Sequence, residues 1–267
     1  MRILLTNDDG YDAPGIILLK SIAKKLAGPE GEVWTIAPMV EMSGTSHCVS
    51  FIHPFRIQKI TPFDFKVEGN PADCVLAGVC HVMTAPPDLI LSGINRGNNS
   101  GENTLYSGTI GAVMEGALQG FKSIAVSQYL GPVITNENNF FDASKQHSLN
   151  LLQQIYKTFP WDSDSYRTFL NINFPPCMGN EVKGVKFVRQ GFRSKSKFSV
   201  TSYTAPNKRE FLCIAGGNQQ SQAEHDSDIS ANLENYISVT PMRADLTDYS
   251  VLAQCEKKVF SVGDLSK

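Results

Sequence analysis

The stretch that decides the fold is RILLTNDDG, residues 2–10. Residues 2–5 predict a short apolar strand, and Asn-Asp-Asp-Gly follows it directly at residues 7–10. In open α/β sheets, ligands bind at the carboxyl ends of the strands. We therefore expect a functional site where this first strand ends.

The rest of the chain repeats the alternation of short apolar strands with helical periodicity. The predicted helices cover residues 15–27, 71–82, 109–121 and 140–156, and the predicted strands cover residues 2–5, 33–37, 88–92, 123–127, 168–174 and 236–241. Residues 50–68 alternate less cleanly and predict an antiparallel excursion. Strands that alternate with helices are typical of a parallel sheet with crossover connections, so we predict an α/β fold with a largely parallel sheet and flanking helices.

Length and composition limit the class of protein. The 267 residues allow one large domain or two small ones, with enough chain to bury a core. With 42% hydrophobic and 19% charged residues, the composition fits a compact enzyme and excludes collagen, coiled coil and disorder. The formal net charge of −2 argues against a nucleic-acid partner.

Charge is unevenly distributed along the chain. Residues 183–209 hold eight of the 24 basic residues and none of the 26 acidic ones. Residues 183–225 are otherwise polar, with a turn signal at residues 216–218. We predict an extended basic hairpin or arm here, solvated along its length, whose aromatic side chains pack on a partner subunit.

Neither a membrane span nor an export signal is evident in the sequence. No segment approaches the ~18 uninterrupted apolar residues of a membrane helix, and the start turns acidic at Asp8 before a signal-peptide core could form. The six cysteines form no C-x-x-C pair, which favours reduced thiols over a disulfide framework or a zinc site. We expect a cytoplasmic protein.

Asp8 and Asp9 are the first candidates for chemistry. Their side chains can share one ion only if the backbone bends, which Gly10 allows. Two close carboxylates repel each other unless a cation or proton intervenes, and oxygen ligands favour a hard ion such as Mg²⁺, Mn²⁺ or Ca²⁺. The alternative is an Asx-rich turn that caps the next helix.

Two further loops bring oxygen atoms to the same predicted sheet edge. Asn95 follows another buried strand and could complete a coordination sphere, although its Asn- and Gly-rich loop is equally compatible with plain left-handed turns. Ser43 could be a further ligand or touch a phosphate. No Gly-x-Ser-x-Gly elbow surrounds Ser43, which disfavours a serine hydrolase.

A fourth cluster, Ser107-Gly108-Thr109, begins the most regular predicted helix. Free amides at a helix start, two hydroxyls and a glycine make a site for an anion, most naturally a phosphate. The alternative is plain N-capping by Ser107 or Thr109. Neither a G-x-G-x-x-G nor a P-loop lysine motif is present, which disfavours dinucleotide redox chemistry and nucleoside-triphosphate-driven work.

These segments recur in a recognisable order: NDDG at 7–10, AP with SG at 37–44, GxPADCV at 69–75, SGINxGxN at 92–99, YSGT with MEG at 106–116, and SVTP at 238–241. In order and spacing they resemble the SurE family, the stationary-phase survival proteins, which are metal-dependent 5′-nucleotidases. Asn70 stands where that family usually has Thr.

The resemblance implies a single domain over residues 1–267. Within it we expect a Rossmann-like catalytic core over 1–181, an extended basic arm over 182–237, and a closing strand and tail over 238–267. It further implies a homodimer or homotetramer built by exchange of the C-terminal arm. The implied substrates are nucleoside 5′-monophosphates, with 3′-nucleotides and short polyphosphate as further substrates of some members.

The resemblance also implies the roles of the site residues. One divalent metal ion per subunit, Mg²⁺ or Mn²⁺ with Ca²⁺ as a substitute in crystals, is expected on Asp8, Asp9, Ser43 and Asn95. The predicted catalytic residues are Asp8, Asp9 and Asn95. The predicted phosphate or substrate contacts are Asn7, Gly44, Asn99, Ser107, Gly108 and Thr109.

The expected mechanism is hydrolysis by water that the metal activates. No histidine lies in these segments, and Asp9 is a candidate proton acceptor. An aspartyl-phosphate route is the nearest alternative, but it needs a second Asp two positions after the nucleophile, where Gly10 follows Asp8. A nucleotide- or RNA-binding regulator without turnover is the alternative from another class, because the basic run interleaves aromatic side chains that could stack on bases.

Overall fold

A nine-stranded sheet organises the part of the chain that the structure, a computed structural model, describes: residues 1–132, 134, 136–161 and 167–255. The strand order is β3-β4-β2-β1-β5-β6-β7-β11-β8. The bounds are Arg2–Thr6 for β1, Glu32–Pro38 for β2, Ile57–Thr61 for β3, Asp64–Val67 for β4, Leu89–Arg96 for β5, Ser123–Gln128 for β6, Phe169–Phe174 for β7, Gly184–Phe187 for β8 and Tyr236–Met242 for β11.

The centre of the sheet is parallel and buried on both faces. Strands β4, β2, β1, β5, β6 and β7 pair in parallel, whereas β3 and β11 are antiparallel to their neighbours β4 and β7. Parallel strands that are covered on both faces consist of nearly continuous apolar runs, as residues 3–5 do. The prediction of a largely parallel α/β sheet is confirmed, with residues 50–68 supplying the antiparallel β3.

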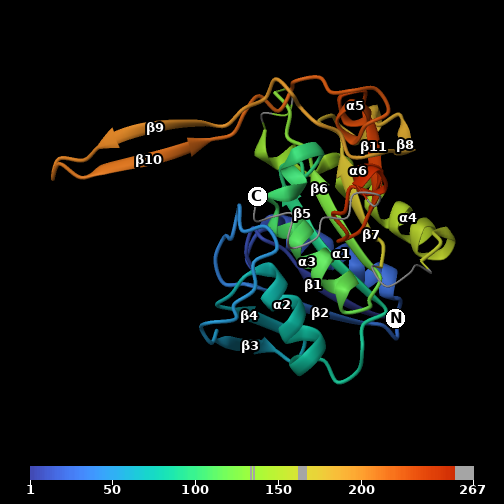
Figure 1. Ribbon diagram of the computed structural model, residues 1–267. Coiled ribbons are helices and arrows are strands. Elements are labelled where there is room, and N and C mark those ends of the chain that lie inside the picture. Colours follow the sequence, from blue (N-terminus) through green and yellow to red (C-terminus); the bar gives the residue numbers. More distant parts are fainter. Residues whose placement is uncertain (133, 135, 162–166, 256–267) are drawn as a thin grey trace, which may run out of the picture.

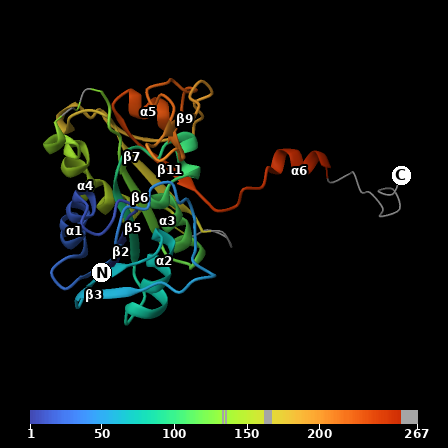
Figure 2. The same ribbon diagram turned by 90° about the vertical axis from the view of Figure 1, so that its left-hand side faces the viewer.

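Helices cover the two faces of the sheet (Figure 2). Ile3 and Leu5 pack with residues of α1 (Pro14–Ala27) and α4 (Asp142–Thr158). Leu4 points to the opposite face, as successive strand residues must, and packs with residues of α2 (Pro71–Ala77) and α3 (Gly108–Leu118). The helix predicted over 71–82 changes at Gly78 into a π-helical turn that ends at Val82.

A two-stranded hairpin of β9 (Ser199–Thr204) and β10 (Glu210–Ala215) projects far from this body (Figure 1). Every residue of both strands is exposed. Within the arm that we predicted over 182–237, these two strands are the part that projects. The first part of the predicted arm forms β8, which pairs with β11, and its last part forms α5 (Asp228–Leu233), whose Ile229 and Ala231 are buried.

The C-terminal segment also leaves the body. Helix α6 (Tyr249–Cys255) extends away from the sheet and buries none of its residues (Figure 2). Residues 256–267 of the predicted tail lie outside the described residues. The division into core, arm and tail stays a prediction.

The basic run is partly neutralised, in contrast to the prediction of a fully solvated arm. Lys186 pairs with Glu234, Arg189 with Glu224 and Arg193 with Glu102. All three acidic partners come from outside residues 183–209, so a count of charges along the run could not reveal them.

Two negative expectations can be compared with the structure. Among the described helices, none is long and apolar enough to cross a bilayer. All six cysteines are free, as predicted.

The first turn of α2 is fixed by the buried carboxylate of Asp73. Its Oδ2 accepts hydrogen bonds from the backbone N–H of Asn70 at 2.8 Å and from the Ser50 hydroxyl at 2.8 Å. Its Oδ1 accepts from the backbone N–H of Ser50 at 2.9 Å. Asp73 thus ties the loop between β2 and β3 to the helix whose Pro71 lies under the start of α3, where a Cβ on Gly108 would come 3.0 Å from Pro71 Cγ.

Replacing this carboxylate tests how much the tie contributes to stability. In Asp73→Asn an amide –NH₂ would face N–H and O–H donors, so the free energy of unfolding should fall by about 1–3 kcal/mol. The measurement is urea denaturation at pH 7. The control is Asp12→Asn, because Asp12 is 74% exposed and makes only a surface pair with Lys66, for which we expect about 0–1 kcal/mol. An equal fall in the free energy of unfolding in the two variants would contradict the stabilising role of the Asp73 carboxylate.

Candidate active site

A cleft of about 390 Å³ opens where β1 and β5 end. It collects residues from each of the four loops that the sequence singled out: Asp8, Asp9, Ser43, Gly44, Asn95, Asn99 and Ser107. In a parallel sheet the carboxyl ends of neighbouring strands lie at one edge. The pairing of β1 with β5 therefore brings residues far apart in the sequence to one place.

Asp8 lines the cleft and is almost fully buried. Its two carboxylate oxygens accept hydrogen bonds from the backbone N–H and the hydroxyl of Thr109, at 3.0 and 2.5 Å. Burial raises the pKa of Asp8, and the bonds from Thr109 oppose that rise. The start of α3 thus holds the orientation of this carboxylate.

Asp9 lies beside it and is only half-buried. Its Oδ2 accepts from the backbone N–H of Arg96 at 3.0 Å. Burial raises the pKa of Asp9 to about 6, with further contributions from the charges of Asp8 and Glu41. The backbone bends directly after it, because Gly10 has φ +98°, as the sequence predicted.

Neutral side-chain oxygen atoms line the cleft beside the two carboxylates. The side-chain –NH₂ of Asn95 donates to the Gly97 carbonyl at 3.0 Å, so the side-chain oxygen is the atom left for a ligand. The Ser43 hydroxyl is exposed and donates to Glu41 at 2.7 Å. Glu41 is a third carboxylate at the cleft that sequence reasoning missed, although it lies only two residues before Ser43.

These donors fit a hard divalent cation. Among the described residues, no group of three or more His, Cys, Asp or Glu side chains is arranged to hold a metal ion. A cation here would therefore depend on two carboxylates and on neutral oxygen atoms, which is the ligand chemistry of Mg²⁺, Mn²⁺ and Ca²⁺. Because the charge of Asp8 helps to raise the pKa of Asp9, a cation between them would stabilise both carboxylates.

Three of the six predicted phosphate contacts lie behind the cleft instead of lining it. Thr109 is fully buried and directs both its donors at Asp8. Asn7 is also fully buried and donates to the Gly10 carbonyl at 2.8 Å. A Cβ on Gly108 would come 2.9 Å from Asp8 Cβ, so this glycine permits the close approach of the start of α3 to the loop that follows β1.

The other three, Gly44, Asn99 and Ser107, line the cleft. Ser107 is the N-cap of α3, since its hydroxyl oxygen accepts from the Ile110 N–H at 3.1 Å. The N-cap alternative thus holds for Ser107, which still faces the cleft. Asn99 uses its –NH₂ on the Ser127 hydroxyl and its backbone N–H on Asn173.

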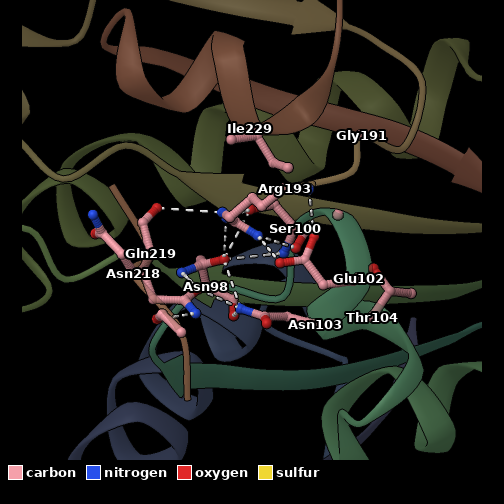
Figure 3. A network of polar contacts seen from close by, with 12 residues as sticks. Asn98, Ser100, Glu102, Asn103, Thr104, Gly191, Arg193, Asn218, Gln219 and Ile229 are labelled. Carbon is pink, nitrogen blue, oxygen red and sulfur yellow. Dashed lines mark hydrogen bonds and ion pairs between the residues drawn. The ribbon is translucent and has the colours of Figure 1, made fainter. Parts of the chain in front are cut away.

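A buried arginine supports one wall of the cleft (Figure 3). Arg193 has no exposed surface, and its guanidinium donates to Asn98 Oδ1 at 3.0 Å and to the Ser100 carbonyl at 3.1 Å. It pairs with Glu102 at 3.2 Å and also donates to the Gln219 carbonyl at 3.3 Å. We expected Arg193 to be a solvated arm cation; that expectation is wrong, because the oxygen-rich loop 98–102 supplies the partners that a buried charge requires.

Comparisons with known proteins agree with this architecture. The family described as survival protein SurE matches residues 3–197. The chain is 54% identical to a protein of Roseobacter denitrificans named 5′-nucleotidase SurE, over 95% of this chain and 97% of that one. It is 52% identical to a protein of the same name from Ruegeria pomeroyi, over 92% and 95%.

A solved structure gives the same result for the fold. The crystal structure of the SurE protein from Aquifex aeolicus superposes with a TM-score of 0.77 and 36% sequence identity, covering 96% of this chain and 99% of that one. The match over most of the sequence, the identity of about one half to full-length relatives and the shared fold lead to one conclusion: this chain belongs to the SurE family.

Proposed function

We propose that the chain is a 5′-nucleotidase that hydrolyses nucleoside 5′-monophosphates to nucleoside and phosphate. One observation carries the proposal: Asp8 and Asp9 line the same cleft as the neutral oxygens of Ser43 and Asn95. Relatives that match nearly the whole chain bear the name 5′-nucleotidase SurE, which supports it.

One divalent cation per subunit, Mg²⁺ or Mn²⁺, would be held by Asp8, Asp9, Ser43 and Asn95. When bound, it supplies positive charge for the phosphoryl oxygens and lowers the pKa of water. All four side chains offer oxygen atoms as ligands, which favours a hard ion over a soft one.

The chain's own residues contribute binding, orientation and proton transfer. Ser107 lines the cleft at the N-terminus of the eleven-residue helix α3, so its hydroxyl and the positive end of the helix dipole face a phosphate bound there. Gly44 and Asn99 also line the cleft. Asp9, whose half-buried carboxylate lines the cleft beside Asp8, is the candidate proton acceptor.

An aspartyl-phosphate route is disfavoured by the surroundings of Asp8. Both of its oxygens accept hydrogen bonds from Thr109, which lowers their nucleophilicity while each keeps a lone pair for a metal ion. Gly10 occupies the position where such a route needs its acid. We further propose a cytoplasmic location, in keeping with six unpaired cysteines.

The metal proposal predicts the behaviour of two variants. Asp8→Asn and Asp9→Asn should each lower metal-dependent phosphate release from a nucleoside 5′-monophosphate by about 100- to 1,000-fold, because each removes charge that acts in the transition state. Calorimetric titration with Mn²⁺ should show weakened binding in both, and circular dichroism should be unchanged.

Asp12→Asn is the matched control for that experiment, since Asp12 lies in the same loop but points to solvent. The panel includes 3′-nucleotides, short polyphosphate, and Mg²⁺, Mn²⁺ and Ca²⁺ in turn. Full activity in EDTA, or in either variant, would refute the metal site.

The structure shows Thr109 donating to Asp8, whereas the sequence predicted a contact with phosphate. A Thr109 variant should affect metal binding in the first case and nucleotide binding in the second. Thr109→Val keeps the shape but loses the hydroxyl that bonds Asp8, so affinity for Mn²⁺ should fall by about 10- to 100-fold. Thr109→Ser should restore most of it. A raised KM for the nucleotide with unchanged Mn²⁺ affinity would instead support the phosphate contact that the sequence predicted.

We propose that the projecting hairpin assembles the subunits into a dimer or tetramer. A lone two-stranded hairpin is marginally stable in water, yet this one exposes large apolar side chains, which mark a contact surface. Those on the two strands are Val200, Tyr203, Phe211, Leu212 and Ile214. The alternative, an RNA-binding arm, is weakened by the burial of Arg193 and the pairing of Arg189.

Removing the hairpin discriminates between these roles. The two legs meet at its base, where a Cβ on Gly217 would come 2.1 Å from Ser196 Oγ, so residues 199–215 can be replaced by a short Gly-Ser turn. Light scattering should then show a lower particle mass with unchanged circular dichroism. A variant with Lys208→Ser and Arg209→Ser in the turn should keep the wild-type mass. An unchanged mass, with loss of RNA binding measured by fluorescence anisotropy, would favour the regulator.

A further inference from the structure

Two aromatic side chains line the cleft beside the carboxylates. Tyr106 precedes the N-cap of α3, and Phe198 comes from the hairpin, just before β9. Their rings meet edge to face, with centroids 5.1 Å apart and planes at 74°. Tyr106 is 48% exposed and Phe198 is 53% exposed. Because about half of each side chain stays exposed, the cleft has an apolar, aromatic surface next to its charged one.

No step of the hydrolysis requires these rings. The carboxylates, the neutral oxygens and the start of α3 all act on the phosphate end of a substrate. A flat and apolar surface on the same cleft matches the other end of a nucleotide, because every base has a π-face that stacks on an aromatic side chain.

We propose that Phe198 and Tyr106 form a stacking site for the nucleobase, which makes Phe198 a specificity-determining residue for nucleotides over other phosphate monoesters. The inference rests on the proposed nucleotidase function and adds to it the part of the substrate that is recognised away from the phosphate.

The buried network around Arg193 holds the base of the hairpin, from which Phe198 extends. Arg193 lies five residues before Phe198, and its backbone carbonyl accepts from the Ser196 N–H at 2.9 Å in the turn between them. The same guanidinium holds Asn98, which is itself part of the cleft lining, and the returning leg of the hairpin at Gln219 (Figure 3). The base of the hairpin is therefore built into the wall of the cleft, whereas its tip projects away from it.

The polar groups near the rings are largely engaged within the protein. Asn98 Oδ1 accepts from Arg193, Ser100 and Asn103, and the –NH₂ groups of Asn98 and Asn103 both donate to Gln219 Oε1. Because these amide groups already bond within the protein, they are poorly placed to form hydrogen bonds with the edge of a base. Recognition should depend on stacking, so all bases should bind, and purines should gain more than pyrimidines because their π-face is larger.

The test compares AMP with ribose 5-phosphate, which is the same phosphate ester without the base. For each variant the readout is the ratio of kcat/KM for the two substrates, with Mn²⁺ present. Phe198→Ala should lower this ratio by about 5- to 100-fold, the range that loss of one stacked base gives, through a raised KM for AMP. Phe198→Leu, which keeps apolar bulk but no flat face, should resemble the alanine variant, and Phe198→Trp should restore the ratio.

Phe211→Ala is the matched control. Phe211 is a phenylalanine of the same hairpin with almost the same exposure, 52%, but it does not line the cleft. Because the ratio is formed within one variant, a change of assembly that alters both substrates equally cancels. The control should therefore keep the wild-type ratio.

The results separate the two proposals. Equal effects of Phe198→Ala on both substrates, a lowered ratio in Phe211→Ala, or no effect at all would overturn the stacking site while the nucleotidase stands. If wild-type protein releases phosphate from neither substrate, the nucleotidase proposal fails, and calorimetric binding of AMP against ribose 5-phosphate decides the stacking site by itself: a preference for AMP that Phe198→Ala removes supports it, and equal affinities refute it.

Discussion

The geometry of the cleft depends on how the protein accommodates two adjacent carboxylates, Asp8 and Asp9, at the end of a buried strand. Burial raises the pKa of both Asp8 and Asp9, and the charge of Asp8 adds to the rise at Asp9. The fold offsets this with hydrogen bonds from outside the loop, from Thr109 at the start of α3 and from the Arg96 N–H at the end of β5. Helix α3 and strand β5 must both be in place for the two side chains to be held, so the site is a product of the whole parallel layer.

A second buried charge, on Arg193, organises the loop that carries Asn98 and Asn99. Arg193 is matched by Glu102 and by oxygens of Asn98 and Ser100, none of which lies near it in the sequence. Removing one partner of such a group leaves the rest uncompensated, which is strongly destabilising. Asp228 reinforces the same region, since it accepts from the backbone N–H of Gly101 and of Gly191. The loop that carries Asn98 and Asn99 is thus held from behind, while its other side faces the cleft.

Sequence patterns predicted the features that depend on neighbouring residues and failed where the partner is remote. Apolar runs such as residues 3–5, and glycine after Asp9, sufficed for the parallel sheet and for the position of the carboxylates at its edge. The basic run did not reveal that Arg193 is buried, because its counter-charge lies about ninety residues earlier in the chain. The hydroxyl of Thr109 belongs to a helix start that fits an anion equally well. Only the close approach of the start of α3 to the loop after β1 shows that the anion it meets is Asp8. Phe198 carries no motif, and β8 is too short for its pairing with β11 to be apparent.

The hairpin can be cut at its tip without separating its two strands. The exposed turn at Ala205–Arg209 contains Lys208 in a left-handed conformation and is the kind of loop tip that proteases cut first. If the turn is cut, the two strands stay paired through the hydrogen bonds between β9 and β10. Arg193, on the first leg of the hairpin, also stays bonded to Gln219 on the second. A chain nicked at Lys208 would therefore run as two fragments in a denaturing gel and as one particle in solution, with the wall of the cleft intact.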